Sequence, residues 1–516
     1  MNLLRAIAAI GSMTMVSRVF GFVRDILIAA VLGAGTSADC FFVAFRLPNL
    51  FRRLFAEGAF AAAFVPIFSG LLETDGREKA KQFADEAFSV LALALVIFTA
   101  LFELAMPLVM YGLAPGFDQV EGKMELATEL SRITFPYLLF ISLVSLQSGV
   151  LNSLGRFAAA AAAPVLLNLT LIAAILTLPA FMETPGHALS WGVAAAGLIQ
   201  LAWLAWHCRR EGFPVRLMRP RLSPEVRLLG RRIVPVVFGA SLYQINLLIG
   251  TILASLLSEG AVSYLYYADR VTQLPLGVVG VAVGTALLPM LSRSIKAGDA
   301  QGALHSQNRG LEFALLLTLP AAIALMVIAE PIISVLFERG RFDAAAALAT
   351  AHALAAFSVG LPAYVLIRVL APGFFAREDT VTPVRIAAVA MAANVALNVI
   401  LMQFWAHVGI ALASSLAAWI NAGLLWIILR RRGFLVLDAR LATRLPRILL
   451  AACLMAGVLA IGRSLLEGPL GGAMLMRIGA LALLVTGGLA AFVAFARMTG
   501  AFSFSDIKTL RRDGSA

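Results

Sequence analysis

The chain has 516 residues, of which 61% are hydrophobic and 14% charged, and its mean hydropathy is +0.91. Soluble globular proteins are about 45–50% apolar and about 25% charged, so this composition excludes a soluble protein and indicates an integral membrane protein. The net charge of +12 does not indicate a nucleic-acid partner, because most Lys and Arg residues fall in alternate loops between apolar segments.

Runs of about 20 apolar residues predict fourteen transmembrane helices and no separate soluble domain. The second run is unusual because it contains many charged residues. The approximate centres of the predicted helices, in chain order, are Phe20, Phe51, Val96, Leu143, Leu171, Ala196, Gly250, Gly280, Met326, Val359, Ala393, Ala417, Met455 and Val485.

Basic residues concentrate in two connections, residues 207–232 and residues 430–447. By the positive-inside rule, this distribution places both termini in the cytoplasm and makes the protein multi-pass. The N-terminus begins like a signal peptide. Its apolar run is too long for one and contains Arg18 and Arg24, so we expect a retained helix.

The two halves of the chain contain an internal repeat, which predicts two pseudo-symmetric lobes of six helices each. The segment AFAAAFVPIFS aligns without gaps with AVGTALLPMLS, and a Leu-Pro pair precedes each segment. The aligned identical pairs include Ala63 with Ala286, Pro66 with Pro289, and Ser69 with Ser292. Parallel repeats of this kind place a transported substrate between the lobes.

The repeat divides this all-α chain into four parts. We expect an N-lobe at residues 1–210, a basic cytoplasmic linker at 211–232 and a C-lobe at 233–432. Residues 433–516 supply two C-terminal helices outside the repeat and a cytoplasmic tail.

Charged residues interrupt the first two apolar runs. A charge at mid-bilayer costs roughly 3 kcal/mol on insertion scales, so such side chains face a wet or protein-lined interior. Arg18 and Asp25 share one helical face. In the second run, an ideal helix would also bring four charged residues within about 40° of one another; they are Asp39, Arg46, Arg53 and Glu57.

The pattern indicates a cationic cavity that binds anions. Five arginines offer planar forks suited to phosphate oxygens; they are Arg18, Arg24, Arg52, Arg53 and Arg270. Four acidic residues are their expected partners: Asp25, Asp39, Glu57 and Asp269. A purely structural alternative is that these charges form ion pairs that join helices, and both roles are compatible.

Other polar residues give weaker signals. Asn246, Asn394 and Asn398 are candidate Na⁺ ligands, with interhelical hydrogen bonding as the alternative. No metal-ligand or catalytic motif is present, so we expect a transporter rather than an enzyme, without a cofactor. Cys40, Cys208 and Cys453 lack paired spacing. The five histidines are expected to be loop residues rather than proton relays: His187, His207, His305, His352 and His407.

Several segments resemble the MurJ (MviN) family of lipid II flippases, within the multidrug/oligosaccharidyl-lipid/polysaccharide exporter superfamily. They are the opening MNLLRAIAAIGSMTMVSRVFGFVRD, then ADCFFVAFRLPNLFRRLFAEGAFAAAFVPIF, YYADRVTQLPLGVVGVAVGTALLPMLS and REDTVTPVRIA. The resemblance implies fourteen helices, a cationic central cavity and a groove for a lipid tail formed by the last two helices.

The resemblance also implies an activity. It is the translocation of undecaprenyl-pyrophosphate disaccharide-pentapeptide across the bacterial inner membrane for peptidoglycan synthesis, by alternating access. The implied partners are lipid II, membrane lipids and cell-wall synthesis proteins. The family's cavity arginines match Arg18, Arg24, Arg52 and Arg270, and its acidic partners match Asp25, Asp39, Glu57 and Asp269.

The energy source stays open at this stage. Na⁺-coupled members have an Asn and an Asp one turn apart in the eleventh helix. This chain has Asn394 and Asn398 there and so lacks the carboxylate. Na⁺ coupling, proton coupling and the membrane potential are the candidate drivers.

Three rival functions remain. The first is an exporter of another polyprenyl-linked glycan or of drugs, although an exporter of cationic drugs would not need an excess of arginine. The second is a lipid-modifying enzyme that uses Glu378 and Asp379, which fit better as a helix cap. The third is a scaffold for cell-wall enzymes, which would not need a charged interior.

Overall fold

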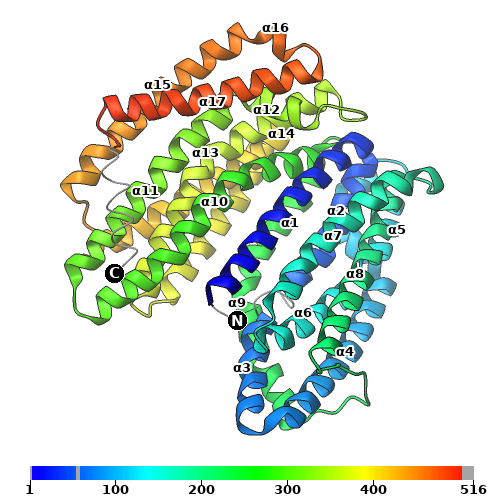
Figure 1. The fold of residues 1–516 in the computed structure, drawn as a ribbon. Helices are drawn as coiled ribbons and strands as arrows, with labels where there is room; N and C mark the ends of the chain where they lie inside the picture. The colour runs from blue at the N-terminus through cyan, green and yellow to red at the C-terminus, as the bar shows by residue number, and fades with distance from the viewer. Residues whose placement is uncertain (1–2, 54–58, 503–516) are drawn as a thin grey trace. The chain divides into compact units, whose positions relative to one another are not determined.

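The computed structural model describes residues 3–53 and 59–502, and helices dominate these ranges (Figure 1). The chain forms two compact units. Unit 1 consists of Met1–Ser263 and Arg339–Phe342, and unit 2 consists of Tyr264–Glu338 and Asp343–Ala516.

Unit 1 is built from long apolar helices and two short 3₁₀ turns. In chain order, its elements are α1 (Leu3–Leu32), α2 (Thr36–Phe51), α3 (Ala59–Thr74), α4 (Gly76–Leu113), η2 (Pro115–Gln119), α5 (Lys123–Thr134), α6 (Tyr137–Ser153), α7 (Phe157–Thr177), η3 (Pro179–Phe181), α8 (Pro185–Arg210) and α9 (Pro224–Ser255). Helix α1 packs along α7, and α8 packs against α5, α6 and α7.

The boundary between the two units falls inside the next long helix, α10 (Ala261–Lys296), whose first three residues belong to unit 1. The elements of unit 2 are the rest of α10, α11 (Ala300–Val327), α12 (Ala329–Phe337), α13 (Ala344–Phe375), α14 (Val381–Arg431), α15 (Ala439–Leu465), α16 (Glu467–Leu470) and α17 (Met474–Met498). Its main core packs α13 against α11 and α14.

All fourteen centres predicted from hydropathy lie in helices, and the chain is an all-α polytopic membrane protein. Nine helical segments of the described residues are long and apolar enough to cross a membrane. Helices α1, α2, α9 and α10, which carry charged side chains, are not among them. The total of fourteen crossings therefore stays a prediction.

Helix α14 is a hairpin of two helices. Its 51 residues would extend about 76 Å if straight. Instead, Arg432 beyond one end donates to Asp379 beyond the other at 2.6 Å. The reversal lies at Trp405 and Ala406, whose backbone angles are not helical. It separates the predicted spans centred on Ala393 and Ala417.

The predicted linker is partly fixed along α4. The backbone N–H of Arg216 donates to Asp85 Oδ1 at 2.8 Å, and that of Met218 donates to Ser89 Oγ at 2.9 Å. Helix α9, which follows the linker, packs on α3 and α4 within unit 1. The compact units therefore divide the chain at a different place from the predicted lobes, whose boundaries stay a prediction.

A short loop of the second half of the sequence belongs to unit 1. The backbone N–H of Arg341 donates to Ala30 O at 2.9 Å, at the end of α1. Two glycines permit this approach, because both have positive φ and a Cβ atom on either would collide with the opposite backbone. A Cβ on Gly33 would lie 2.6 Å from Arg341 O, and one on Gly340 would lie 2.2 Å from Ala30 O.

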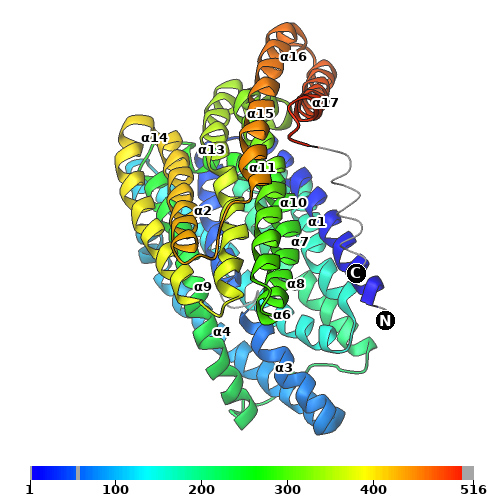
Figure 2. The same cartoon turned by 90° about the vertical axis from the view of Figure 1, so that its left-hand side faces the viewer.

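The C-terminal helices are fastened to α11 by a charged cluster. Glu312 on α11 is 6% exposed and accepts hydrogen bonds from Arg440 and Arg444 of α15. Arg309 contacts both Glu312 and Asp438, the residue that caps α15. Helices α15 and α17 run side by side and are joined through α16 (Figure 2).

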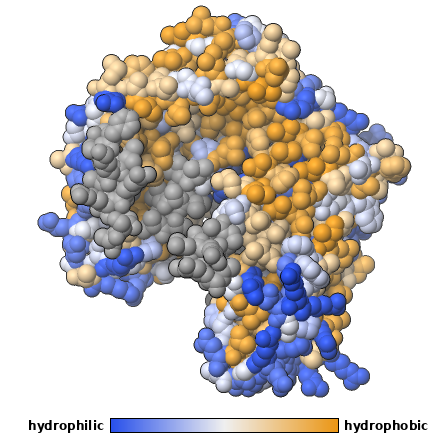
Figure 3. All heavy atoms as spheres, viewed as in Figure 1, coloured by the Kyte–Doolittle hydropathy of each residue, from blue (hydrophilic) through white to orange (hydrophobic). Residues whose placement is uncertain are grey.

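The surface of unit 1 separates into apolar and charged zones. Hydrophilic side chains gather at the end where α4 begins, and apolar side chains cover the region beyond it (Figure 3). Along α4, exposed apolar residues begin at Leu93, one turn after Ser89, and continue to Leu108. The linker residues bound to Asp85 and Ser89 thus lie just before the part of α4 whose exposed side chains are apolar and suited to contact with lipid.

Loss of the Asp85 carboxylate should release the linker. Hydrogen bonds to a buried charged group contribute about 1.5–3 kcal/mol, so Asp85→Ala should speed tryptic cleavage after Arg216 and Arg221 roughly tenfold or more. Time-resolved proteolysis of the detergent-purified chain measures this rate. Glu78→Ala, at an exposed site of the same helix, is the matched control. Equal cleavage rates in both variants would show that the linker is not held by Asp85.

Candidate functional site

Helix α1 contains a buried ion pair between two adjacent residues, Arg24 and Asp25. Arg24 Nη2 lies 2.7 Å from Asp25 Oδ1, and Arg24 Nε donates to the same oxygen at 3.0 Å. The two residues are 7% and 3% exposed. Because the charges compensate each other, the pair avoids most of the cost of burying a lone guanidinium.

A third residue completes this group from the neighbouring helix. Arg24 Nη1 donates to Asn168 Oδ1 of α7 at 2.8 Å, and Asn168 Nδ2 donates to Ser17 O of α1 at 2.9 Å. The amide packs beside Gly21, where a Cβ would lie at an ordinary contact distance of 3.4 Å from Asn168 Nδ2. Asn168 was not among the predicted site residues, although it is a lone amide within the apolar stretch APVLLNLTL and could have been found by that signal.

The other predicted arginines of unit 1 are more exposed than Arg24. Arg18 is exposed on α1, and Arg53 is exposed just beyond α2. Arg52 is half-buried and its Nε donates to Asn49 Oδ1 at 3.1 Å. Glu57 lies outside the described residues, so its predicted alignment with Arg53 stays a prediction.

Asp39 has partners other than the cavity arginines expected from the sequence. It is 1% exposed, and its Oδ2 accepts from Lys123 Nζ at 2.8 Å and from Gly260 N at 2.9 Å. Its Oδ1 accepts from Ser263 N at 3.0 Å and Ser263 Oγ at 2.6 Å. All four bonds fasten α2 to α5 and to the start of α10, which is a structural role, and the expected pairing of Asp39 with cavity arginines stays a prediction.

A second acidic residue strengthens the same connection. Glu259 Oε1 accepts from the backbone N–H of Thr36 at 2.6 Å and from its hydroxyl at 2.5 Å. These hydrogen bonds hold the pKa of the Glu259 carboxyl below its usual value. The end of the loop that leads into α10 is therefore held against the start of α2 by two neighbouring residues, Glu259 and Gly260.

Arg270 and Asp269 lie on α10 in unit 2, where both are half-buried. Arg270 Nη2 donates to Tyr266 Oη at 3.1 Å, and the guanidinium carbon lies 4.7 Å from the centre of the Tyr266 ring. Asp269 accepts from Gln273 one turn later. Tyr266 thus orients Arg270, a contact that the sequence analysis did not foresee.

The asparagines proposed as ion ligands divide between the units. Asn394 and Asn398 are buried in unit 2, where Asn398 Nδ2 donates to Asn394 Oδ1 at 2.7 Å. Within the described residues, Asn398 Oδ1 is buried without a hydrogen-bond partner. Asn246 belongs to α9 in unit 1. The neutral amides of Asn394 and Asn398 offer only a weak cation site, because Asn394 Oδ1 already accepts a hydrogen bond from Asn398.

Asp379 is engaged as a helix cap rather than as one of a catalytic carboxylate pair. Its Oδ1 accepts from Thr382 N at 2.9 Å, and its Oδ2 accepts from Thr382 Oγ1 at 2.6 Å. Together with Arg432, these bonds hold the pKa of Asp379 well below its usual range. The geometry confirms the capping interpretation of this residue.

The chain is similar along nearly its whole length to proteins of one family. A family model described as "Lipid II flippase MurJ" matches residues 28–480. A "Probable lipid II flippase MurJ" of Rhizobium meliloti (strain 1021) is 46% identical, covering 100% of this chain and 98% of the relative. One of Rhizobium tropici is 45% identical, covering 99% and 97%. The chain belongs to the MurJ family.

A solved MurJ structure has the same fold. The structure described as "Lipid II flippase MurJ, inward closed conformation" matches with a TM-score of 0.77 at 23% identity, covering 95% of this chain and 98% of that one. At this identity the likeness establishes the fold alone.

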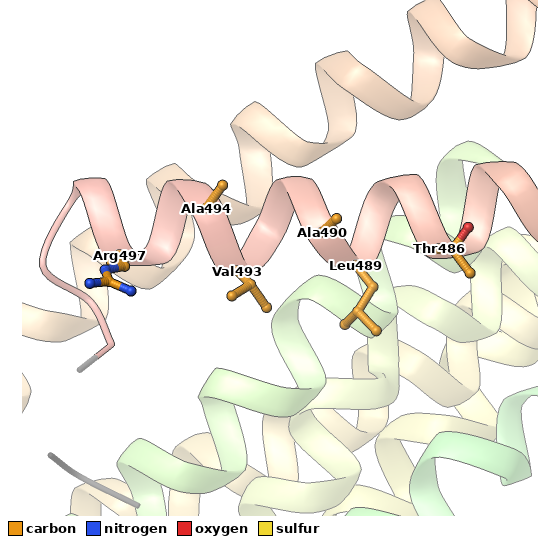
Figure 4. A pocket seen from close by; sticks show the side chains of 6 residues that line it. All are labelled: Thr486, Leu489, Ala490, Val493, Ala494 and Arg497. Carbon is orange, nitrogen blue, oxygen red and sulfur yellow. The ribbon is translucent and has the colours of Figure 1, made fainter. Parts of the chain in front are cut away.

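The MurJ resemblance predicted a groove for a lipid tail at the last two helices. An open groove runs along one side of α17 in unit 2 (Figure 4). It is lined by Thr486, Leu489, Ala490, Val493, Ala494 and Arg497. Most of this lining is apolar, and Arg497 lies at the end of the helix. All six residues belong to α17, so a lipid-tail groove formed by the last two helices together stays a prediction.

Removal of Asp39 should destabilise this MurJ-family chain strongly. Asp39→Ala leaves the buried Lys123 ammonium unpaired, and loss of one partner of a buried pair costs about 3–5 kcal/mol. Reversible unfolding in mixed micelles measures the change. The exposed pair of Lys79 and Asp75 supplies the control Asp75→Ala, which should change stability much less. Similar losses in both variants would contradict the structural role of Asp39.

Proposed function

We propose that the chain translocates lipid II, the undecaprenyl-pyrophosphate disaccharide-pentapeptide, from the cytoplasmic to the periplasmic leaflet of the bacterial inner membrane. The observation that carries this proposal is the buried Arg24, held by Asp25 and Asn168 where helices α1 and α7 pack together. Membership of the MurJ family supplies the substrate class. The basic connections at residues 207–232 and 430–447 support cytoplasmic termini.

The arginines are proposed to bind the diphosphate. A guanidinium presents two parallel donors to phosphate oxygens, and Asp25 and Asn168 fix the plane of Arg24 before substrate arrives. Tyr266 would orient Arg270 in the same way. Arg18, Arg52 and Arg53 are exposed or half-buried and so remain accessible to an anion.

Asp25 also has a part in release. While the cavity is empty, its carboxylate neutralises Arg24, so the site carries little unpaired charge. A diphosphate would compete with the carboxylate for the same guanidinium. Binding is therefore an exchange of partners, which limits the affinity and permits the substrate to leave on the other side.

The polar head and the tail are proposed to take different routes. The head crosses between two lobes that alternate in access, as in other repeat-built transporters. The polyprenyl tail stays in lipid and lies against the groove of α17, where Leu489 and Val493 present exposed apolar surface. Only the head then needs shelter from hydrocarbon, and no catalytic step is involved.

The membrane potential is the proposed driver. An inside-negative potential favours outward movement of an anion by about 2.3 kcal/mol per charge per 100 mV, and a diphosphate carries two charges. Na⁺ is a second candidate because Asn398 Oδ1 is buried without a partner among the described residues. The absence of a carboxylate at Asn394 and Asn398 favours the potential. Contacts with cell-wall synthesis proteins are proposed on the family resemblance alone.

Arginine substitutions test the proposal. In a bacterium depleted of its own lipid II flippase, Arg24→Ala and Arg270→Ala should fail to restore growth, while Arg221→Ala in the exposed linker should restore it. Arg24→Lys should give partial activity, because it keeps the charge but loses the two-pronged contact. Labelling of lipid II in the outer leaflet measures transport directly.

Normal outer-leaflet labelling with both alanine variants would overturn the assignment of these arginines. Failure of the unchanged chain to move lipid II, with movement of another polyprenyl-linked glycan, would instead support the rival exporter. Membrane abundance of each variant is measured in the same cells, so that loss of protein is distinguished from loss of transport.

A further inference from the structure

Three side chains with metal-ligating atoms meet at the beginning of α8. They are Glu129 of α5, Glu183 in the connection before α8, and His187 in the first turn of α8. One ligand atom from each lies within 4.8 Å of the other two. The sequence analysis treated His187 as a loop residue, but it lies in the helix.

His187 is the member of this group that most needs a partner. It is 5% exposed, and its Nε2 has no hydrogen-bond partner among the described residues. Glu129 Oε1 lies 3.4 Å from Nε2 but does not form a hydrogen bond with it. A buried ring nitrogen without a partner is costly, so its approach to two carboxylates calls for a cation between them.

The other ring nitrogen is already held. Nδ1 lies 2.9 Å from Thr184 Oγ1, and Thr184 is the residue that caps α8. Metal-binding histidines commonly have their second nitrogen fixed in this way, which orients the ring and sets its tautomer. The ring of His187 is thus aimed at the two carboxylates before any ion binds.

The spacing fits a small divalent ion. Zn²⁺ binds nitrogen and oxygen ligands at about 2.0–2.1 Å, so two ligands of a tetrahedral site lie about 3.4 Å apart. The measured separation of His187 Nε2 and Glu129 Oε1 is 3.4 Å. Glu129 and Glu183 are exposed, so both carboxylates have freedom to close on the ion. Two carboxylates and a neutral imidazole balance its charge.

We propose that Glu129, Glu183 and His187 form a Zn²⁺ site that ties α5 to the start of α8. A water molecule would fill the fourth position. Helix α8 continues for 26 residues to Arg210, about 39 Å away, where the basic linker begins. If the linker is cytoplasmic, the site lies at the outer end of unit 1. It is independent of the arginines that are proposed to bind lipid II.

A zinc titration of the full-length chain tests this proposal. The chain is purified in detergent without a polyhistidine tag, stripped with a chelator, and titrated with Zn²⁺ against a chromophoric competitor. We expect one Zn²⁺ per chain, at least tenfold weaker binding in Glu129→Gln, and loss of the site in His187→Gln. Co²⁺ in the same site should show the visible absorption of a tetrahedral centre.

Two matched controls distinguish this site from general zinc binding. Glu125→Gln changes an exposed carboxylate one turn earlier on α5, and His352→Gln changes an exposed histidine in unit 2. Both should bind Zn²⁺ like the unchanged chain. Zn²⁺ should raise the thermal unfolding midpoint of the unchanged chain but not that of Glu129→Gln. Because Glu129 is exposed, this variant keeps its fold and decides the result even if His187→Gln does not fold.

Two outcomes would overturn the proposal. One is an unchanged chain that takes up no Zn²⁺. The other is equal affinity in Glu129→Gln and Glu125→Gln. Either result would make the contact between Glu129 and His187 an ion pair that forms only when the imidazole is protonated.

Discussion

Burial of charge is the constraint on which the specific contacts of both units depend. A charged group removed from water must find an opposite charge or several hydrogen bonds, or its burial is prohibitively costly. Asp39 meets this requirement with Lys123 and three donors at the start of α10. Glu312 meets it with arginines from its own helix and from α15. In both groups, neutralisation also joins elements that are distant in sequence.

Arg24 satisfies the same constraint in a way that suits a transient ligand. Its partners are Asp25, which is adjacent in sequence, and the neutral Asn168. Asp39 is tied instead into two other segments, so its bonds cannot be exchanged without loosening the fold. Thus two buried acidic residues that look alike in sequence differ in their contacts: Asp39 joins three segments of the fold, whereas Asp25 pairs with the neighbouring Arg24 and is the one proposed to exchange partners with a substrate.

Hydropathy was sufficient to locate the helices, because burial in lipid requires a long apolar run wherever the chain crosses. Hydropathy also separated the two halves of α14, between which the chain reverses direction at Trp405 and Ala406. Partners were harder to predict. Lys123 lies 84 residues from Asp39, and Asn168 lies 144 residues from Arg24. Helical periodicity identifies which residues share a face, but it carries no information about which helix that face meets.

The attachment of the linker to α4 has a mechanical consequence. Hydrogen bonds from the backbone of Arg216 and Met218 to Asp85 and Ser89 fix this segment along α4, so it is not a flexible linker over this length. Helix α9 therefore begins shortly after an anchored point, with residues 219–223 between the bond of Met218 and the first turn of the helix. A rocking displacement of α9 would have to be absorbed by bending within this short piece or by swinging α4 along with it.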